Sequence, residues 1–173
     1  AEQLCISYNK SFNLPVTILR PFNVFGPRQS ARAIIPTIIS QYAKNSDYLS
    51  LGLTSTTRDF NYVDDTINAL TKCISAKNIN GEIINIGTGK EFSIRTIAKL
   101  IAEYFGKPLK IKLKENRIRP KNSEVTRLCS STKKAKKLLK WNSAIKNKTD
   151  LRKKIYMTID WYIKNIHLMK INP

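Results

Sequence analysis

Apolar positions in this chain follow two different periods, and segments of the two kinds alternate along its length. Short runs rich in Ile, Leu, Val and Tyr predict strands, whereas longer runs with apolar residues three or four apart predict helices. The expected strands are 15–20, 47–53, 58–63, 81–87 and 108–115. The expected helices are 1–13, 33–44, 64–77, 93–106, 131–141 and 149–165. This alternation favours an α/β fold.

Two of the predicted helices have distinctive ends. Ser93 is the expected N-cap of one helix, and Gly106 is expected to end it. The helix that opens the chain starts at Ala1 with no capping residue before it. Because a natural domain rarely begins within a helix, we expect the sequence to be a fragment of a longer protein.

The segment INIGTGKEFSI, residues 84–94, has the look of a phosphate-binding loop. A P-loop requires Ser or Thr after its Gly-Lys pair, but Glu91 stands there. The first glycine, Gly87, also stands too close to the glycine of that pair, Gly89. A dinucleotide fingerprint requires a third glycine, which the segment lacks. We therefore interpret it as an ordinary turn between a strand and a helix.

The formal net charge of +19 is distributed unevenly. Residues 1–106 carry 11 basic and 8 acidic side chains, whereas residues 107–173 carry 20 and 4. The shift predicts a boundary between 1–106 and a basic C-terminal subdomain, 107–173. Ile, Lys and Asn supply 23, 22 and 15 residues, a bias that an AT-rich genome would give and that accounts for part of the lysine excess. No zinc spacing or RNA-binding motif accompanies the charge. We therefore expect no specific nucleic-acid partner.

The cysteines Cys5, Cys73 and Cys129 lie far apart and have no metal-ligand spacing. Such a scattered, odd set is typical of reduced thiols in the cytoplasm. Cys5 and Cys73 fall within apolar helical patterns and are expected in the core. The lone histidine, His167, belongs to no recognisable Ser-His-Asp set. No apolar run reaches the roughly 18 residues of a membrane span, so no membrane partner is expected.

The stretch RPFNVFGPR, residues 20–28, places polar side chains directly behind the apolar run 15–19. In open α/β sheets, ligands bind just beyond the carboxyl ends of the strands. Asn23 is therefore a candidate ligand contact, although it could instead cap the turn through its own backbone. Arg20 stands at the end of the expected buried strand and is as well explained by a structural ion pair.

This stretch resembles the extended short-chain dehydrogenase/reductase family, in particular its NAD-dependent nucleotide-sugar epimerases and 4,6-dehydratases. Arg20, Asn23, Gly26 and Pro27 fit the family pattern Arg-x-x-Asn-x-x-Gly-Pro, and AEQLC is similar to the tail of its catalytic helix. RDFNYVDD, EIINIGTG, an Arg-Pro…Glu loop and Leu-x-Trp follow in the family's order. The resemblance implies the C-terminal part of a Rossmann-like fold, interleaved with and followed by a small α/β substrate-binding lobe.

The resemblance also implies roles for individual residues around the ligand. Asn23 would contact a bound sugar-diphosphate, and the backbone at Pro21 and Phe22 would lie beside the nicotinamide of NAD. The nucleotide base would meet the backbone or side chains of Ala33, Ile34, Leu49 and Leu51. Plain core packing is the alternative for this last group.

Arg58, in TRDFNYVDD, would bind the diphosphate by resemblance, since its planar, always-charged donor fork matches phosphate. A surface pair with Asp59 or Asp64 is the alternative. Asp64 and Asp65 could be read as paired acid-base carboxylates, but they more simply cap the helix that follows.

The loop RPKNSEV holds Arg119 and Glu124. By resemblance the arginine would bind the diphosphate and the acid the ribose hydroxyls, although a solvated loop acid is the alternative for Glu124. The acid stands five residues after the arginine, where many epimerases have three. The Ser-Glu-Val form is more similar to 4,6-dehydratases that act on N-acetylated sugars. Arg117 and Arg127 are weaker candidates.

The family's glycine-rich cofactor fingerprint and its catalytic Tyr-x-x-x-Lys pair are not in these 173 residues. The resemblance places both before Ala1, so we expect no catalytic residue in this chain. In the family the tyrosinate takes the proton of the sugar 4-hydroxyl while hydride passes to NAD. The expected function is thus the nucleotide-sugar-binding half, inactive alone, of an NAD-dependent nucleotide-sugar 4,6-dehydratase whose parent is a cytoplasmic homodimer.

Three alternatives stay open at this point. The parent could be a nucleotide-sugar 4-epimerase, because the residues that separate the two reactions are not in this sequence. The chain could instead be a basic protein that binds nucleic acid or other anions non-specifically. It could also be a remnant that binds nothing and gains no stability from any ligand.

Overall fold

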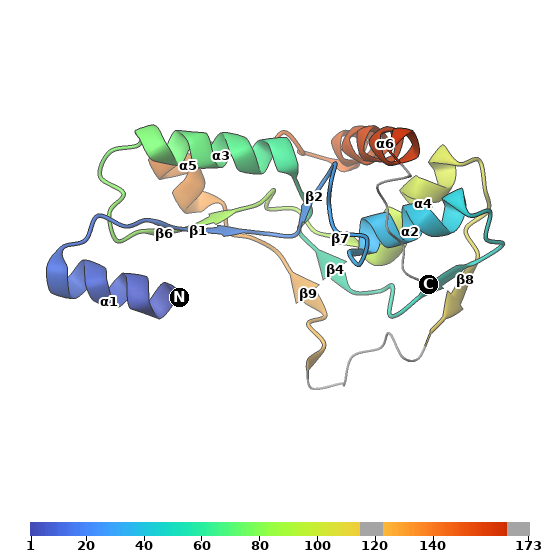
Figure 1. The fold of residues 1–173 in the computed structure, drawn as a ribbon, viewed down its shortest axis with the longest axis horizontal. Coiled ribbons are helices and arrows are strands. Elements are labelled where there is room, and N and C mark those ends of the chain that lie inside the picture. The colour runs from blue at the N-terminus through green and yellow to red at the C-terminus, as the bar shows by residue number, and fades with distance from the viewer. Residues whose placement is uncertain (115–122, 166–173) are drawn as a thin grey trace.

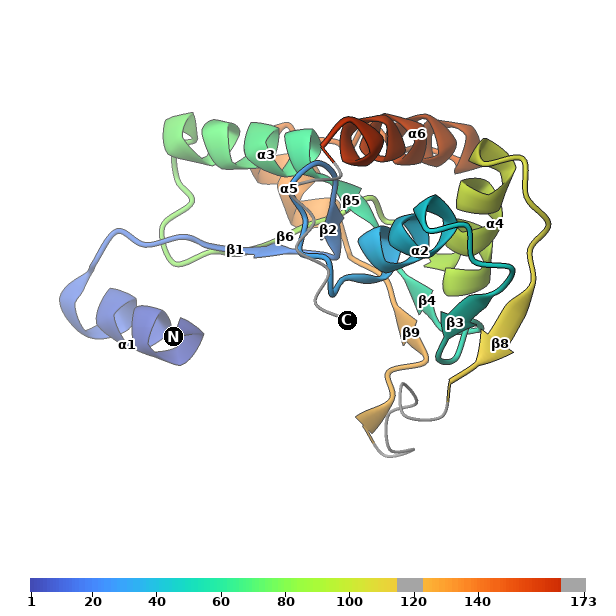
Figure 2. The same cartoon turned by 45° about the vertical axis from the view of Figure 1, so that its right-hand side comes forward.

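A computed structural model describes residues 1–114 and 123–165. One group of elements comprises β1 (Ile18–Pro21), β6 (Ile83–Ile86), α3 (Val63–Ser75) and α5 (Lys133–Leu139). The strands β1 and β6 are parallel, with Leu19 opposite Ile84. The helices α3 and α5 lie on one side of this strand pair (Figure 1, Figure 2). The apolar side chains between them form the smaller core cluster, Ala69, Ile79, Ile84, Ile86, Ala135, Leu139 and Trp141.

A second group of elements holds the larger core. Its helices are α2 (Ile34–Ala43), α4 (Ile94–Tyr104) and α6 (Lys148–Lys164), which pack against one another. Its parallel strand pairs are β2 (Val24–Phe25) with β5 (Asn61–Tyr62) and β3 (Leu49–Leu51) with β8 (Ile111–Leu113). A three-stranded sheet places β4 (Thr57–Arg58) between antiparallel β7 (Phe92–Ser93) and parallel β9 (Arg127–Leu128).

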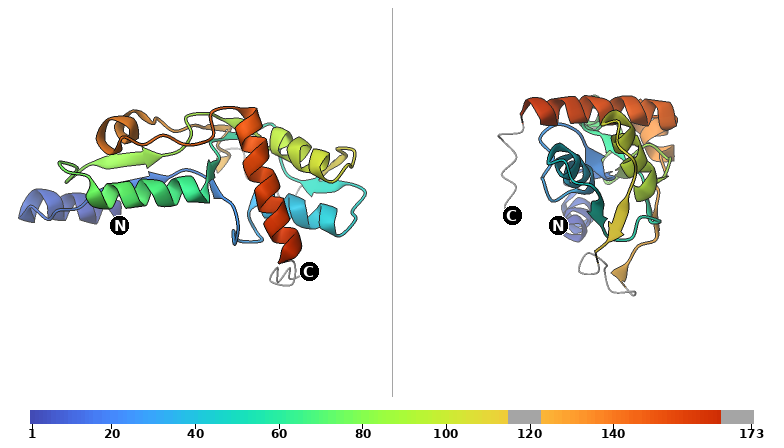
Figure 3. Two further views of the ribbon diagram at one scale, coloured as in Figure 1. Left: turned by 90° about the horizontal axis from the view of Figure 1, so that it is seen from above. Right: turned by 90° about the vertical axis from the view of Figure 1, so that its right-hand side faces the viewer.

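Both core clusters combine side chains from the two sides of the charge boundary near residue 107. The larger cluster joins Leu100 and Ile101 of α4 to Ile155 and Ile159 of α6. The smaller one joins strand β6 to Trp141, just after α5. The two segments therefore pack against each other along an elongated molecule (Figure 3). Their division into an epimerase part and a substrate-binding subdomain stays a prediction.

Helix α1 (Glu2–Phe12) lies at one end of the elongated ribbon and has no buried residue (Figure 3). The prediction that Cys5 is a core residue is therefore wrong, whereas Cys73 does pack against the smaller cluster. The apolar run before Arg20 is also less buried than predicted, because β1 has no fully buried residue. Arg20 forms the expected ion pair, since its Nε lies 3.0 Å from the carboxylate of Glu2.

The predicted ends of two helices can be compared with the structure. Ser93 caps α4 as predicted, because its hydroxyl accepts a hydrogen bond of 3.1 Å from the Thr96 amide. Asp64 and Asp65 lie in the first turn of α3, at its positive end as predicted, but neither is its N-cap: that residue is Tyr62, which makes no side-chain cap bond. Asp65, in the first turn, instead accepts hydrogen bonds from the Ser143 hydroxyl at 2.6 Å and the Ala144 amide at 2.8 Å. Its carboxylate thus fastens the segment after α5 to α3.

The three cysteines are free thiols, and burial raises the pKa of Cys73 and of Cys129. Within the part of the chain that the structure describes, no helix has the length and apolar character that crossing a membrane requires. Neither do the described residues contain a group of three His, Cys, Asp or Glu side chains that could hold a metal ion.

Tyr162, on α6, makes the free energy of unfolding fall as the pH rises through the alkaline range. Its side chain is buried and donates a hydrogen bond to the backbone carbonyl of Gln29, and burial raises its pKa to about 12. An unfolded tyrosine ionises near pH 10. The stabilisation that Tyr162 gives is therefore complete below about pH 10 and is lost as the pH rises toward about 12.

We expect urea unfolding to show this loss directly. Between about pH 9 and about pH 11, the free energy of unfolding should fall more steeply for the wild type than for Tyr162→Phe, which cannot ionise at this position. The other tyrosines are common to both proteins and cancel in the comparison. Parallel declines of the two proteins would show that Tyr162 does not carry the effect.

Candidate functional site

A cavity of about 980 Å³ opens beside α2, β3 and β4. Most of the side chains that the sequence predicted as ligand contacts line its wall. They are Asn23, Ala33, Ile34, Leu51, Arg58 and Glu124. These residues come from five different segments of the chain, so the fold gathers them from positions up to about a hundred residues apart.

The other predicted site residues lie elsewhere. Leu49 does not line the cavity; it is fully buried in the larger core cluster, as its alternative interpretation held. Leu51 adjoins the cavity but is fully buried in the same cluster, so core packing applies to it as well. Pro21 and Phe22 also lie outside the lining, at the carboxyl end of β1, where the Phe22 amide donates to the Ile86 carbonyl at 2.8 Å. Arg119 lies outside the described residues, as do Arg117 and His167.

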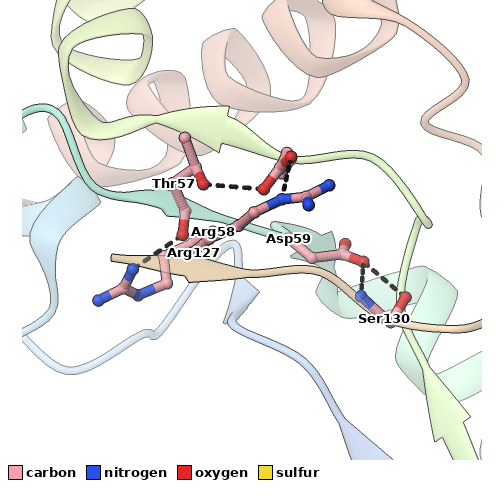
Figure 4. A network of polar contacts seen from close by, with 6 residues as sticks. Thr57, Arg58, Asp59, Arg127 and Ser130 are labelled. Atoms are coloured by element: carbon pink, nitrogen blue, oxygen red, sulfur yellow. Dashed lines mark hydrogen bonds and ion pairs between the residues drawn. The ribbon is translucent and has the colours of Figure 1, made fainter. Parts of the chain in front are cut away.

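Arg58 and Glu124 form an ion pair at the cavity wall. The Arg58 Nη2 lies 3.2 Å from the Glu124 Oε1, and the two side chains are 16% and 14% exposed. The second terminal nitrogen of Arg58 donates to the Thr57 carbonyl at 2.8 Å (Figure 4). The alternative pairing of Arg58 with Asp59 or Asp64 is therefore wrong. The alternative role of Glu124, a solvated loop acid, is also wrong, because its side chain is largely buried against Arg58.

Asn23 faces the cavity from the turn between β1 and β2. Its side-chain amide donates to the backbone carbonyl of Asp59 at 3.2 Å. The backbone carbonyl of Asn23 accepts from the backbone amide of Asn61 at 3.2 Å. The side chain thus bonds across to the chain after β4, which differs from the local turn cap considered for it. This contact holds the β1–β2 turn beside Arg58.

Asp59 is a fully buried carboxylate that joins three distant segments. One oxygen accepts from the Thr88 amide at 2.8 Å and the Thr88 hydroxyl at 2.7 Å. The other accepts from the Gly89 amide at 3.0 Å. That oxygen also accepts from the Ser130 amide at 3.0 Å and hydroxyl at 2.6 Å (Figure 4). The backbone amides of Thr88 and Gly89, in the glycine-containing turn, thus donate to a carboxylate of the protein itself, which confirms that the turn is structural.

Glycine at position 87 is required by this arrangement. A Cβ atom there would lie 2.5 Å from the Ser130 hydroxyl and 2.9 Å from the Asp59 carboxylate. Both distances are shorter than a Cβ atom tolerates, so the close approach of the turn to Asp59 excludes a side chain at Gly87. The sequence shows the glycine but not the distant groups that demand it.

Glu91 links the three strands of the β7–β4–β9 sheet. It accepts from the Thr57 hydroxyl at 2.8 Å and from the Arg127 Nε at 2.6 Å (Figure 4). The Thr57 hydroxyl and then Arg127 hold the pKa of Glu91 below its usual value. Arg127 is thus a partner of Glu91 on the strand next to Arg58, and it does not line the cavity.

Several polar residues of the cavity wall were not predicted from the sequence. Thr37, Ser40, Gln41 and Lys44 all lie on or just after α2 and face the cavity. Their spacing of three or four residues forms a polar stripe along an otherwise apolar helix, and that stripe could have been read from the sequence. Arg32, just before α2, adds a further exposed cation to the lining.

Comparisons with known proteins show the family and the fold of this chain. The sequence model of the family described as GDP-mannose 4,6 dehydratase matches residues 1–154. The dTDP-D-glucose 4,6-dehydratase of Homo sapiens is 31% identical over 172 residues, which are 98% of this chain and 48% of that protein.

Solved structures give the same result. The UDP-glucuronic acid 4-epimerase from Bacillus cereus, in complex with UDP-glucuronic acid and NAD, is 30% identical with a TM-score of 0.82, over 94% of this chain and 50% of that one. An epimerase from Methanothermobacter thermautotrophicus is 28% identical with a TM-score of 0.84, over 98% and 49%. The chain spans about half the length of the curated relatives it matches.

The fold and these matches define a class, the NAD-dependent nucleotide-sugar dehydratases and epimerases of the extended short-chain dehydrogenase/reductase family. Within that class, the chain belongs to the GDP-mannose 4,6 dehydratase family of sequences. The predicted α/β, Rossmann-like fold is confirmed by the parallel strand pairs and by the solved structures of similar fold.

Proposed function

We propose that this chain is the nucleotide-sugar-binding half of an NAD-dependent nucleotide-sugar 4,6-dehydratase. The observation that carries the proposal is the cavity wall, where an arginine, a carboxylate and an amide face one space: Arg58, Glu124 and Asn23. A 4-epimerase is the alternative, since the relatives include enzymes of both kinds.

Each of these groups suits one part of a nucleotide sugar. The Arg58 guanidinium can donate to diphosphate oxygens, and the Glu124 carboxylate can accept from vicinal ribose hydroxyls. The Asn23 amide can both donate to and accept from the sugar or its phosphate. An apolar contact for the base would come from Ile34, which is partly exposed at the cavity wall. The chain would thereby hold the nucleotide and orient the sugar, which lowers the entropic part of the barrier to reaction.

NAD would supply the hydride acceptor in the whole protein. At the carboxyl end of β1, Pro21 is exposed and Phe22 is half-buried, so this backbone is open to a flat ring such as nicotinamide. The glycine-rich turn that would hold the rest of NAD is not among the 173 residues. We therefore propose that most contacts to NAD come from outside this chain and that the chain alone does not turn over substrate. The cytoplasmic location and the homodimer stay predictions.

Loss of the Arg58 side chain should weaken nucleotide binding about 10- to 100-fold, because a charge-assisted hydrogen bond contributes about 1.5–3 kcal/mol. Calorimetric titration of the chain with UDP, GDP and dTDP would compare wild type with Arg58→Ala. Arg95→Ala is the matched control, since this exposed arginine on α4 does not line the cavity and should leave affinity unchanged. Equal affinity of the wild type and Arg58→Ala would show that the site is wrongly assigned.

The same titrations separate the proposal from a general anion-binding role. A basic protein of that kind would bind inorganic polyphosphate as well as any nucleoside diphosphate, and its affinity would fall steeply with salt. It would also respond equally to Arg58→Ala and Arg95→Ala, because only the total charge would matter. A protein that binds no nucleoside diphosphate at all would contradict the proposed function outright.

A further inference from the structure

We infer that Tyr162, on α6, is a positioning residue for the cavity: its hydroxyl holds the β2–α2 loop, residues 26–33, in the shape that receives a ligand. Tyr162 does not itself line the cavity, so its effect on binding passes through the loop. The inference rests on the proposed function, because the affinity that it concerns is the affinity for a nucleoside diphosphate.

The β2–α2 loop forms one side of the cavity. Four of its eight residues line the wall: Gln29, Ala31, Arg32 and Ala33. Much of its hydrogen bonding is local. The Ala33 amide donates to the Ser30 carbonyl at 2.9 Å, and the Gln29 side-chain amide donates to the Val24 carbonyl at 2.7 Å. Such bonds give the loop its shape, but they join it only to itself and to the strand before it.

Tyr162 supplies a tie to a distant element. Its hydroxyl donates to the backbone carbonyl of Gln29, 133 residues earlier in the chain. Within the part of the chain that the structure describes, it is the one side-chain hydrogen bond that joins the loop to an element other than β2 and α2. The loop is therefore fastened to α6 at the residue where its cavity-lining part begins.

Backbone strain lies directly beside this tie. Arg28 has a φ of 63°, in the left-handed region that residues other than glycine rarely adopt. A conformation of this kind persists only where the surrounding structure holds it. The carbonyl that Tyr162 binds belongs to the next residue, Gln29. Loss of the hydrogen bond would thus remove a restraint at the point where the loop is most inclined to change its course.

Helix α6 is a firm anchor for the loop. The Tyr162 side chain is 2% exposed and belongs to the larger core cluster, together with Ile155 and Ile159 of the same helix. The helix packs against α2 and α4 (Figure 2). Because packing holds the ring, Tyr162→Phe should remove the hydroxyl and leave the ring in place. The loop then gains conformations that do not fit the ligand, and the apparent affinity falls with the fraction that does fit.

The first test is calorimetric titration of the full chain with whichever of UDP, GDP or dTDP the wild type binds. Tyr162→Phe should weaken binding about fivefold, which corresponds to about 1 kcal/mol, the usual contribution of one hydrogen bond. Tyr104→Phe is the matched control. It also removes a tyrosine hydroxyl bonded to α6, but that bond goes to Asp160 and does not involve the loop. This variant should leave the affinity unchanged.

Hydrogen exchange separates positioning from general stabilisation of the fold. The backbone amides of the loop should exchange about fivefold faster in Tyr162→Phe than in the wild type, because the loop opens locally more often. A variant that lowers only the global stability does not change amides that exchange through local opening. Tyr104→Phe should therefore leave exchange in the loop at the wild-type rate.

The outcomes distinguish the inference from the proposed function. If Tyr162→Phe binds the nucleotide as tightly as the wild type, or if Tyr104→Phe weakens binding as much, the inference is wrong while the proposed function stands. Unchanged exchange in the loop of Tyr162→Phe would overturn the inference in the same way. If the wild type binds none of the three nucleotides, the proposed function fails and the inference fails with it.

Discussion

Replacement of Asp59 with alanine is expected to lower the free energy of unfolding by about 3–5 kcal/mol. The carboxylate is fully buried and accepts hydrogen bonds from Thr88, Gly89 and Ser130, three of them from backbone amides. A methyl group cannot accept any of these bonds, and each buried donor left without a partner costs about 1–3 kcal/mol. Loss of the tie also releases the turn after β6 and the end of β9 from β4.

Urea unfolding at neutral pH would measure this effect, with Asp64→Ala as the matched control. Asp64 is exposed in the first turn of α3, so its loss should cost less than about 1 kcal/mol through the helix dipole. Asp59→Asn should fall between the two, because an amide keeps one accepting oxygen. If Asp59→Ala and Asp64→Ala were equally stable, the bonds of Asp59 would contribute little to the fold.

Trp141→Ala should have a similar effect, a loss of about 3–5 kcal/mol, because it leaves a large cavity in the smaller core cluster. Trp141 is almost completely buried among side chains of β6, α3 and α5, and its indole nitrogen donates to the Asp65 carbonyl at 3.1 Å. The residue therefore joins the C-terminal segment to β6 and α3 by packing, and to α3 also by a hydrogen bond.

Two further variants would separate these contributions. Trp141→Phe keeps much of the apolar volume but removes the hydrogen bond, so we expect a clearly smaller loss of stability than for alanine. Ile74→Ala, on α3 and 88% exposed, should change stability by no more than about 0.5 kcal/mol. Thermal or urea unfolding of the three variants gives the comparison, and a loss for Trp141→Ala no larger than for Ile74→Ala would refute it.

The helices were predictable from sequence because their apolar spacing is local. Ser93 could be identified as a cap for the same reason, since its partner, Thr96, is three residues away. The strand expected over 58–63 is instead two short strands, because Asp59 and Phe60 are buried between them and Asp59 turns to remote donors. The error for Cys5 has a related cause: apolar spacing predicts an amphipathic helix but does not identify a surface that buries it.

The candidate site was predictable as a set of residues but not as an arrangement. Motif order and spacing led to Asn23, Arg58 and Glu124, which line one cavity. Their contacts could not be foreseen, because Arg58 and Glu124 are 66 residues apart and nothing local to either pairs them. Leu49 and Leu51 share one face of a short strand, and both are fully buried in the larger core cluster although Leu51 also adjoins the cavity, so alternation alone could not separate wall from core.

The tie between Asp59 and Ser130 makes local opening of this part of the molecule cooperative. One oxygen of the Asp59 carboxylate accepts from both the Gly89 amide and the Ser130 amide, so the turn after β6 and the residues that follow β9 share one buried acceptor. Neither segment can leave β4 without breaking hydrogen bonds to a carboxylate that also holds the other. The turn and β9 therefore belong to one unit of local unfolding.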